Sequence, residues 1–362
     1  MAAGQSVIDP ARITPAFRDF DPMPNEKSLK CEVMPLKPRI DFGFRFQAGY
    51  FVRVPLNQYR GAGHSWSILT RVTPQGEHGE PVMLLNRIRL PNVPVTNLVA
   101  EVGGSYLLGE GKYTVDLLLY DDSSRACRKT FQLEAKRGRG ERDMTLRLQP
   151  GQVRSIASRH APTDTKVGER PYRISVLVDV APMFPRSTRL RAWDKEMLLG
   201  TLGPMLELLP AQSVRLVMFN LDQQKVIFTQ DKFGLEDIGQ VAQALNGLEL
   251  GTINIGVLGN TGGHVSLLSE LINQELHATE PPDALVFLGP ISRHIEKFPQ
   301  SAIDVRGGGD DPRMFYVQYR PPVERGAFSD IIENAVRLVK GKTFHVHNPS
   351  EFAAAIRQIS RF

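Results

Sequence analysis

Over its first half, the chain alternates apolar and polar residues in short stretches separated by turn-forming residues. The alternation opens at Phe44-Arg45-Phe46-Gln47 and continues through residues 50–54. Further stretches, separated by clusters of Gly, Pro, Asp and Ser, lie at 65–72, 81–90, 97–102, 112–120 and 127–134. Alternation with period two indicates strands with one buried face, and short strands at spacings of roughly 8–12 residues are typical of a sandwich. The sequence therefore predicts an all-β sandwich domain over residues 42–150.

Two segments flank this predicted sandwich. Residues 1–41 contain six prolines and little alternation, so they predict an extended arm that lies on a domain or stays mobile. Residues 135–170 are polar and basic, apart from a short stretch at 144–148 that we expect to close the sandwich as a last strand. Residues 151–171 are predicted to be a linker.

From residue 172 onward, strand-like and helix-like patterns alternate. Residues 174–180 form an apolar run of the buried-strand type, and residues 190–209 repeat apolar side chains at helical spacing. The next two strands, at 214–219 and 225–228, are joined by a connection too short for a crossover helix, so we expect them to pair antiparallel. Helices are expected at 235–245, 264–277, 328–339 and 349–359, and strands at 284–288, 313–318 and 343–347. This alternation predicts a doubly wound, mostly parallel sheet.

Residues 172–362 resemble a von Willebrand factor A domain, in particular the bacterial VWFA-related domain family. Three features carry the resemblance: the apolar strand ending in Asp179 before a long helix, the hairpin at 214–228, and the order of the later elements, which end in a strand and a C-terminal helix. Many members of that family are secreted proteins of unassigned function, and such domains bind other proteins at the carboxyl ends of their strands. Residues 108–115 resemble the turn into a late strand of immunoglobulin-like domains, with Tyr113 near its start. The expected fold is an immunoglobulin-like sandwich followed by a von Willebrand A-like α/β domain.

The resemblance implies a divalent cation site whose ligands are mostly replaced in this chain. The family uses an Asp-x-Ser-x-Ser motif after the first strand, a Thr before a later helix and an Asp after the fourth strand. Here the motif reads Asp179-Val180-Ala181-Pro182-Met183, and the fourth strand runs into Gly289-Pro290 without an Asp. Asp179 and Thr261 alone remain, whereas a hard cation needs about six oxygen ligands. We therefore predict a degenerate site without metal, in which Asp179 is a structural or capping carboxylate.

No other motif predicts catalysis or a cofactor. The Gly-rich loop 259–263 precedes a helix but lacks the Gly-Lys-Ser/Thr ending of a phosphate-binding loop, so turn flexibility explains its glycines. The sequence contains no nucleophile elbow. Several histidines lie near the ends of predicted elements with no evident nucleophile or further ligand beside them: His264, His277, His294, His345 and His347. We predict no catalytic residue, no metal and no cofactor.

Composition narrows the possible functions only a little. The 362 residues are 41% hydrophobic and 23% charged, which is ordinary for a globular chain and excludes a disordered or fibrous one. The net charge of +5 is too small to argue for nucleic acid unless it is concentrated on one face, and the basic stretch 137–142 lacks interleaved aromatic residues. No apolar run approaches the ~18 residues that span a bilayer, so we expect no membrane span.

The two cysteines, Cys31 and Cys127, are predicted to form one disulfide bond. Residues 32–34 are apolar enough to run along the sandwich as a first or edge strand, and a bond beside them would hold the arm in place. A disulfide requires an oxidising compartment, in agreement with the secreted members of the family resembled. The chain starts without a secretion signal, so either a signal was removed or the protein is cytoplasmic with two buried thiols. We expect a secreted or periplasmic location.

These observations favour a non-enzymatic protein of the bacterial cell envelope or exterior that binds another protein, as an adhesion or scaffold protein. Its contact face would be formed by loops at the carboxyl ends of the strands, with Asp179, Met183, Phe184, Arg186, Thr261, His264 and His294. Met183 and Phe184 could instead pack under their loop. Two alternatives stay open: a hydrolase or other enzyme using loop carboxylates such as Asp179 and Asp310, and a structural envelope component. The sequence identifies neither the partner nor the oligomeric state.

Overall fold

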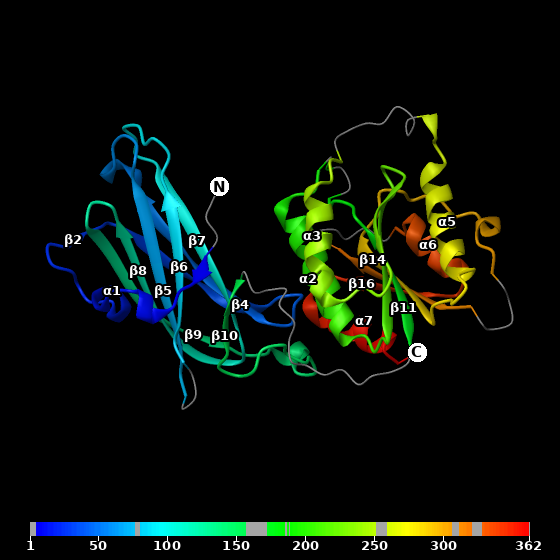
Figure 1. Cartoon of the computed structure of the whole chain (residues 1–362), viewed down its shortest axis with the longest axis horizontal. Coiled ribbons are helices and arrows are strands. Elements are labelled where there is room, and N and C mark those ends of the chain that lie inside the picture. Colours follow the sequence, from blue (N-terminus) through cyan, green and yellow to red (C-terminus); the bar gives the residue numbers. More distant parts are fainter. Residues whose placement is uncertain are drawn as a thin grey trace. The chain divides into compact units, whose positions relative to one another are not determined.

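The computed structural model describes residues 5–76, 80–156, 172–184, 187, 189–250, 259–305, 311–320 and 328–361. The chain divides into two compact units, Met1–Thr163 and Asp164–Phe362. The first unit is built from strands and the second alternates strands with helices, as the two hydrophobic patterns predict (Figure 1). No helix in the described part of the chain combines the length and apolarity needed to cross a membrane.

The first unit contains two sheets. One is six-stranded in the order β1-β6-β5-β8-β9-β2, with β1 Ser6–Val7, β2 Lys27–Ser28, β5 Ser65–Pro74, β6 Val82–Arg89, β8 Gly111–Asp121 and β9 Arg125–Ala135. The other is four-stranded in the order β10-β7-β4-β3, with β3 Glu32–Ile40, β4 Phe46–Pro55, β7 Val99–Leu108 and β10 Val153–Ser155. All of these pairings are antiparallel except that of β2 with β9.

Alternating side chains of the two sheets form the core of this unit. Tyr50 and Val52 of β4 and Ile68 of β5 are fully buried, and the Thr70 hydroxyl donates a hydrogen bond of 3.0 Å to the Tyr50 oxygen. The outer face of the six-stranded sheet is covered as well, because apolar residues of the N-terminal segment pack on Leu69 and Leu118. That segment includes the short helix α1, Pro15–Asp19.

The predicted boundaries of this unit need two corrections. Residues 144–148 form no strand; Met144 and Leu148 are buried as loop residues, and Arg147 donates its backbone N–H to the Phe44 carbonyl at 3.0 Å. The closing strand is β10, which lies within the predicted linker and pairs with β7. The remainder of that linker, residues 157–171, lies outside the described residues. The predicted arm lies on the sandwich and supplies β1, β2 and β3.

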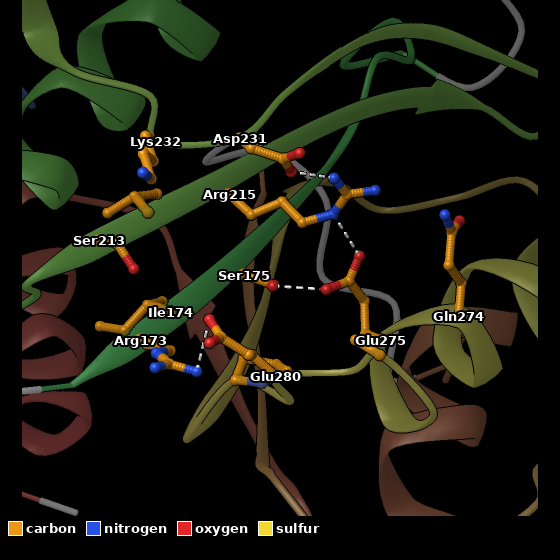
Figure 2. A pocket seen from close by; sticks show the side chains of 13 residues that line it. Arg173, Ile174, Ser175, Ser213, Arg215, Asp231, Lys232, Gln274, Glu275 and Glu280 are labelled. Carbon is orange, nitrogen blue, oxygen red and sulfur yellow. Dashed lines mark hydrogen bonds and ion pairs between the residues drawn. The ribbon is translucent and has the colours of Figure 1, made fainter.

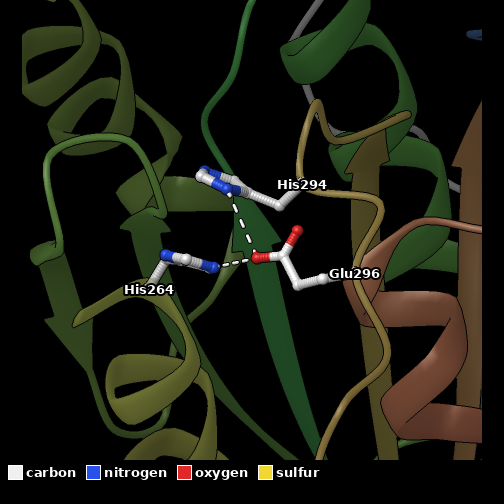
Figure 3. Close-up of side chains that lie close together, drawn as sticks. All are labelled: His264, His294 and Glu296. Carbon is white, nitrogen blue, oxygen red and sulfur yellow. Dashed lines mark hydrogen bonds and ion pairs between the residues drawn. The ribbon is translucent and has the colours of Figure 1, made fainter. Parts of the chain in front are cut away.

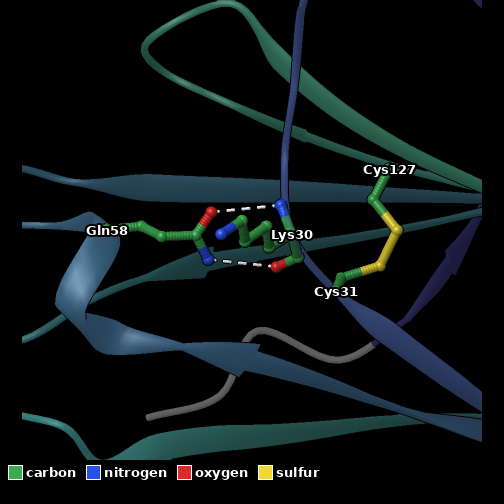
Figure 4. The surroundings of a disulfide bond; sticks show 4 residues. All are labelled: Lys30, Cys31, Gln58 and Cys127. Atoms are coloured by element: carbon green, nitrogen blue, oxygen red, sulfur yellow. Dashed lines mark hydrogen bonds between the residues drawn. A yellow bond between two sulfur atoms is a disulfide. The ribbon is translucent and has the colours of Figure 1, made fainter.

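The predicted disulfide bond between Cys31 and Cys127 is present and connects residues 96 apart in sequence, with 6.2 Å between their Cα atoms (Figure 4). It links the residue before β3 to β9 of the other sheet. The Gln58 side-chain amide holds the same segment by bonding both the N–H and the carbonyl of Lys30, each at 3.0 Å. Closing a loop of about 100 residues stabilises the fold by up to about 4–5 kcal/mol in the chain-entropy model.

The second unit has one six-stranded sheet in the order β13-β12-β11-β14-β15-β16. The strands are β11 Arg173–Asp179, β12 Ser213–Asn220, β13 Lys225–Gln230, β14 Ala284–Pro290, β15 Arg313–Tyr319 and β16 Lys342–Val346. Five are parallel, and the edge strand β13 pairs antiparallel with β12, which confirms the predicted hairpin. Chain order and spatial order reverse between β11 and β14, and crevices in open α/β sheets form outside the carboxyl ends of strands at such a point.

Helices cover both faces of this sheet. Helices α5 (Gly263–Leu276) and α6 (Ile331–Leu338) bury their apolar sides against one face, in a cluster that includes Leu177, Phe287 and Tyr316. Helices α2 (Ala192–Leu208), α3 (Ile238–Asn246) and α7 (Pro349–Ile359) lie on the other face (Figure 1). The carboxyl ends of the parallel strands and the loops that follow them form one edge, called here the carboxyl-end face.

Candidate functional site

Asp179 ends β11 at the point where the sheet order reverses. Its side chain is buried, and neither carboxylate oxygen has a hydrogen-bond partner in the described part of the chain. Burial raises the pKa of Asp179 well above its usual value, and the nearby charges of Asp222 and Asp330 raise it further. Both effects favour the protonated form of the carboxyl group.

Close packing seals this carboxyl group from the surface. A Cβ added at Gly289, in the neighbouring strand β14, would lie 2.9 Å from the Asp179 Cβ and 3.0 Å from its backbone oxygen. Met183, in the loop after β11, is also buried, and its N–H donates to Asp194 of α2 at 3.0 Å. Asp179 and Met183 thus contribute nothing to a contact surface in this conformation; for Met183, packing under the loop is what occurs.

Asp330, which the sequence analysis overlooked, is the best-connected carboxylate of the face. It caps α6 by accepting the Glu333 N–H at 2.8 Å, and it accepts the Ser292 N–H at 2.8 Å. The Tyr316 hydroxyl, at 3.0 Å, and the Gln318 side-chain amide, at 2.8 Å, donate to it from β15. Burial raises the pKa of Asp330, although these four hydrogen bonds oppose the shift. Asp330 therefore ties the loop after β14 to β15 and α6.

Beside this layer lie the buried His264, the half-buried His294 and the exposed Glu296 (Figure 3). His264 lies in the first turn of α5, and His294 and Glu296 lie in the loop after β14. The imidazole rings are stacked with centroids 4.1 Å apart. Glu296 Oε1 contacts His264 Nε2 and lies 3.8 Å from His294 Nδ1. The other ring nitrogen of His294 lies 3.0 Å from Asp222, in the β12–β13 turn.

The cations and hydrogen bonds of this cluster keep its carboxylates ionised. Burial alone would raise the pKa of Asp222, but the hydrogen bond to His294 and the charge of Arg293 outweigh it and lower the pKa. Burial likewise opposes ionisation of Glu296, but its own backbone N–H and His264 lower its pKa. The face thus contains a buried carboxyl group with a raised pKa, Asp179, and carboxylates with a lowered pKa beside it.

The other predicted contact residues have mixed outcomes. Phe184 and Thr261 are exposed, His294 is half-buried, and His264 is buried. Arg186 and Asp310 lie outside the described residues. The sequence analysis named His264 and His294 but missed Asp222 and Glu296. The available signal was the run 293–296, which places a cation, an imidazole and a carboxylate directly after a buried strand.

His345 of β16 and His347, just after that strand, are held separately from this cluster. His345 Nδ1 lies 2.9 Å from the Gln318 side-chain oxygen, and His347 Nδ1 lies 3.1 Å from Glu351. Burial lowers the pKa of His345, and Arg320 lowers it further. Among the described residues, neither histidine belongs to a group of three potential metal ligands.

A cavity of about 460 Å³ lies at the opposite edge, at the amino ends of β11 and β12 (Figure 2). Glu275 is buried there and accepts the Ser175 hydroxyl at 2.6 Å and the Arg215 Nε at 2.8 Å. Arg215 also contacts Asp231, and Arg173 pairs with Glu280 at 3.0 Å. These charges satisfy one another, so this cavity is a weaker candidate than the carboxyl-end face.

Comparison with known proteins identifies no family for this chain. No family model and no curated protein matches it. An ApaA protein of Bordetella pertussis is 16% identical over 31% of this chain and 99% of its own, with a TM-score of 0.22. A superoxide reductase (neelaredoxin) of Ignicoccus hospitalis is 14% identical over 28% of this chain and 82% of its own, with a TM-score of 0.20. A Paenibacillus cycloisomaltooligosaccharide glucanotransferase is 8% identical over 81% of this chain and 45% of its own, with a TM-score of 0.18. Likenesses this weak carry no argument about function.

Proposed function

We propose that the protein is a non-enzymatic interaction protein of the bacterial cell envelope or exterior, acting in adhesion or as a scaffold. In this proposal the second unit is a von Willebrand A-like domain with a degenerate metal motif. Its sheet order, with β11 at the centre and an antiparallel hairpin at one edge, agrees with that interpretation, as does the position of Asp179 at the end of the first strand. The same strand order occurs in other doubly wound folds. The proposed function therefore depends on the exposed side chains and not on the strand order.

The first unit is proposed to be an immunoglobulin-like sandwich. Tyr113, at the start of β8, donates its hydroxyl to the Gly109 carbonyl at 2.8 Å. A tyrosine bonded to the backbone a few residues upstream is a recurrent feature of that architecture. Such domains commonly present or space a binding domain, which agrees with an adhesion or scaffold role.

The observation that carries the proposal is a group of exposed apolar side chains on the carboxyl-end face. Four different loops or helix starts each place one there: Phe184 is 44% exposed, Trp193 38%, Ile295 61% and Phe328 42%. Single exposed apolar residues are common, but several at one edge favour a protein interface, where aromatic anchors contribute most of the binding energy. Arg293 and Thr261 supply polar positions beside them.

An enzyme remains the second candidate because one observation favours it. The pKa of Asp179 is strongly raised, as expected of a general acid. A catalytic acid must also reach its substrate, and Asp179 is only 1% exposed. The cavity at the amino ends of β11 and β12 lies away from Asp179, and so does a second cavity at the amino ends of β15 and β16, lined by Arg313 and Lys342. A structural envelope component, the third alternative, would need no specific partner.

The test compares two double variants of the full chain in affinity capture. Phe184→Ala with Ile295→Ala truncates the proposed face, whereas Leu338→Ala with Val305→Ala truncates residues of comparable exposure near the amino ends of the strands. We expect the first pair to lose a partner that the wild type and the second pair retain, with thermal stability unchanged in all. Equal recovery by both double variants would contradict the proposed face.

The disulfide bond supports the proposed compartment, because such bonds persist in oxidising spaces. Thiol counting on protein denatured without reductant, taken directly from its native compartment, should find no free thiol. Two free thiols there would remove the physical argument for export.

A further inference from the structure

We propose that His264, His294 and Glu296 form a binding site for a zinc-type transition metal ion. One ligand atom from each residue lies within 4.8 Å of the other two. Two imidazoles and one carboxylate form a donor set that suits Zn²⁺, with bonds of about 2.0–2.2 Å, and three protein ligands leave a fourth position for water. Glu296 is exposed, so its side chain has room to move from its contact with His264 to the ion.

The backbone that carries these ligands is already fixed. His264 lies in the first turn of a helix of 14 residues. The loop with the other two ligands is tied to α6, because the Ile331 N–H donates to the His294 carbonyl at 2.8 Å and the Asn334 amide donates to the Glu296 carbonyl at 3.0 Å. The backbone therefore needs no rearrangement, and binding requires only that the stacked imidazole rings turn about their side-chain torsions to direct a nitrogen at the same ion.

Asp222 supplies an independent observation that points to a metal. It lies 3.0 Å from His294 Nε2, and this leaves Nδ1 on the side of Glu296 and the proposed ion. Metal-binding histidines characteristically bond a carboxylate through the ring nitrogen that does not bind the ion, which fixes both tautomer and orientation. The pair His294 and Asp222 therefore has the arrangement of a ligand and its supporting carboxylate.

Charge also favours a divalent cation here. Asp222 and Glu296 contribute two negative charges, and Arg293 contributes one positive charge through its contact with Asp222. These three side chains together carry a net negative charge, which exceeds the partial positive charge of the α5 N-terminus. This donor set lies apart from the oxygen-ligand motif around Asp179. The proposed zinc site therefore replaces the expectation that the protein binds no metal, but it does not use the motif at Asp179. The site is compatible with the proposed protein partner and does not require one.

The experiment is calorimetric titration of chelator-treated full-length protein with Zn²⁺. We expect saturation at one ion per chain, and visible absorption of tetrahedral type when Co²⁺ is used. Mg²⁺ should give a flat titration, because the donors are mainly nitrogen. Glu296→Gln keeps the shape of an exposed side chain and should weaken binding strongly. Asp222→Asn should weaken it by about 10–100-fold.

The matched control is His277→Ala, which removes a histidine paired with Asp304 at the other end of α5. It should bind Zn²⁺ as the wild type does, whereas His264→Ala with His294→Ala should abolish binding while retaining the circular dichroism spectrum. No saturable Zn²⁺ binding by the wild type would overturn the proposal. Equal binding by Glu296→Gln, Asp222→Asn and the wild type would also overturn it, even if the double histidine variant failed to fold.

Discussion

Two buried carboxylates lie at opposite edges of the same sheet, and their surroundings differ. Glu275, at the amino-end edge, accepts hydrogen bonds from Ser175 and Arg215. Asp179, at the carboxyl-end face, is as deeply buried but accepts none within the described residues, and Asp222 and Asp330 add negative charge nearby. At one edge a cation and a hydroxyl compensate the buried carboxylate, whereas at the other burial and two nearby carboxylates raise the pKa of the carboxyl group.

Glu275 is therefore a structural carboxylate with its partners in place, whereas the position of Asp179 is not explained by structural hydrogen bonds. A buried polar group without a partner costs about 1–3 kcal/mol, and folds keep such exceptions mainly at functional or strained positions. The carboxyl-end face also carries the exposed apolar side chains and the histidine cluster. Three substitutions test this comparison, from the largest expected effect to the smallest.

Arg215→Ala should be the most damaging, because it leaves Glu275 buried without its cation. Removing one partner of a buried pair costs about 3–5 kcal/mol, and the partial exposure of Arg215 places the expected loss near 3 kcal/mol. Urea denaturation measures it. Arg173→Ala, which breaks the exposed pair with Glu280, is the control and should cost at most about 1 kcal/mol. Equal losses would show that Glu275 does not depend on its cation.

Gly289→Ala should cost about 1–3 kcal/mol, because the new methyl group meets the Asp179 backbone and Cβ in a packed layer. Gly239→Ala is a control of opposite sign: this glycine is exposed within α3, has no heavy atom within 4 Å of an added Cβ, and should gain up to about 1 kcal/mol of helix propensity. The difference in melting temperature between the two variants is the measurement. A neutral Gly289→Ala would mean that the layer around Asp179 is looser than its geometry indicates.

At pH 5, Asp179→Asn should change the free energy of unfolding less than the two preceding substitutions do. The change should grow above pH 5. A carboxyl group whose pKa is raised by folding stabilises the native state below its unfolded value of 3.8, and that contribution is lost as the pH rises. Asn does not titrate, so the variant should gain stability relative to the wild type between pH 5 and pH 8. If the melting temperatures of the wild type and the variant changed equally with pH across this range, Asp179 would be ionised and would have a partner.

Most of the fold was predictable because its signals are local. Period-two alternation located β4, β5 and β8, and the apolar run before Asp179 located β11. The prediction of a strand at residues 144–148 was wrong because buried loop side chains have the same apolar composition as a strand. The strand that closes the sandwich, β10, is only three residues long, too short for its periodicity to be recognised.

Sequence alone also determined the disulfide partners, because the chain has two cysteines, and the direction of the β12–β13 pairing, because the connection is short. Tertiary structure decided the site. Asp222, His264, His294 and Glu296 come from two loops and the first turn of a helix, and no periodicity along the chain relates them; they meet because the parallel strands end at one edge. The same holds for the contrast between Asp179 and Glu275, since the state of a buried carboxylate depends on neighbours supplied by distant residues rather than on its own sequence context.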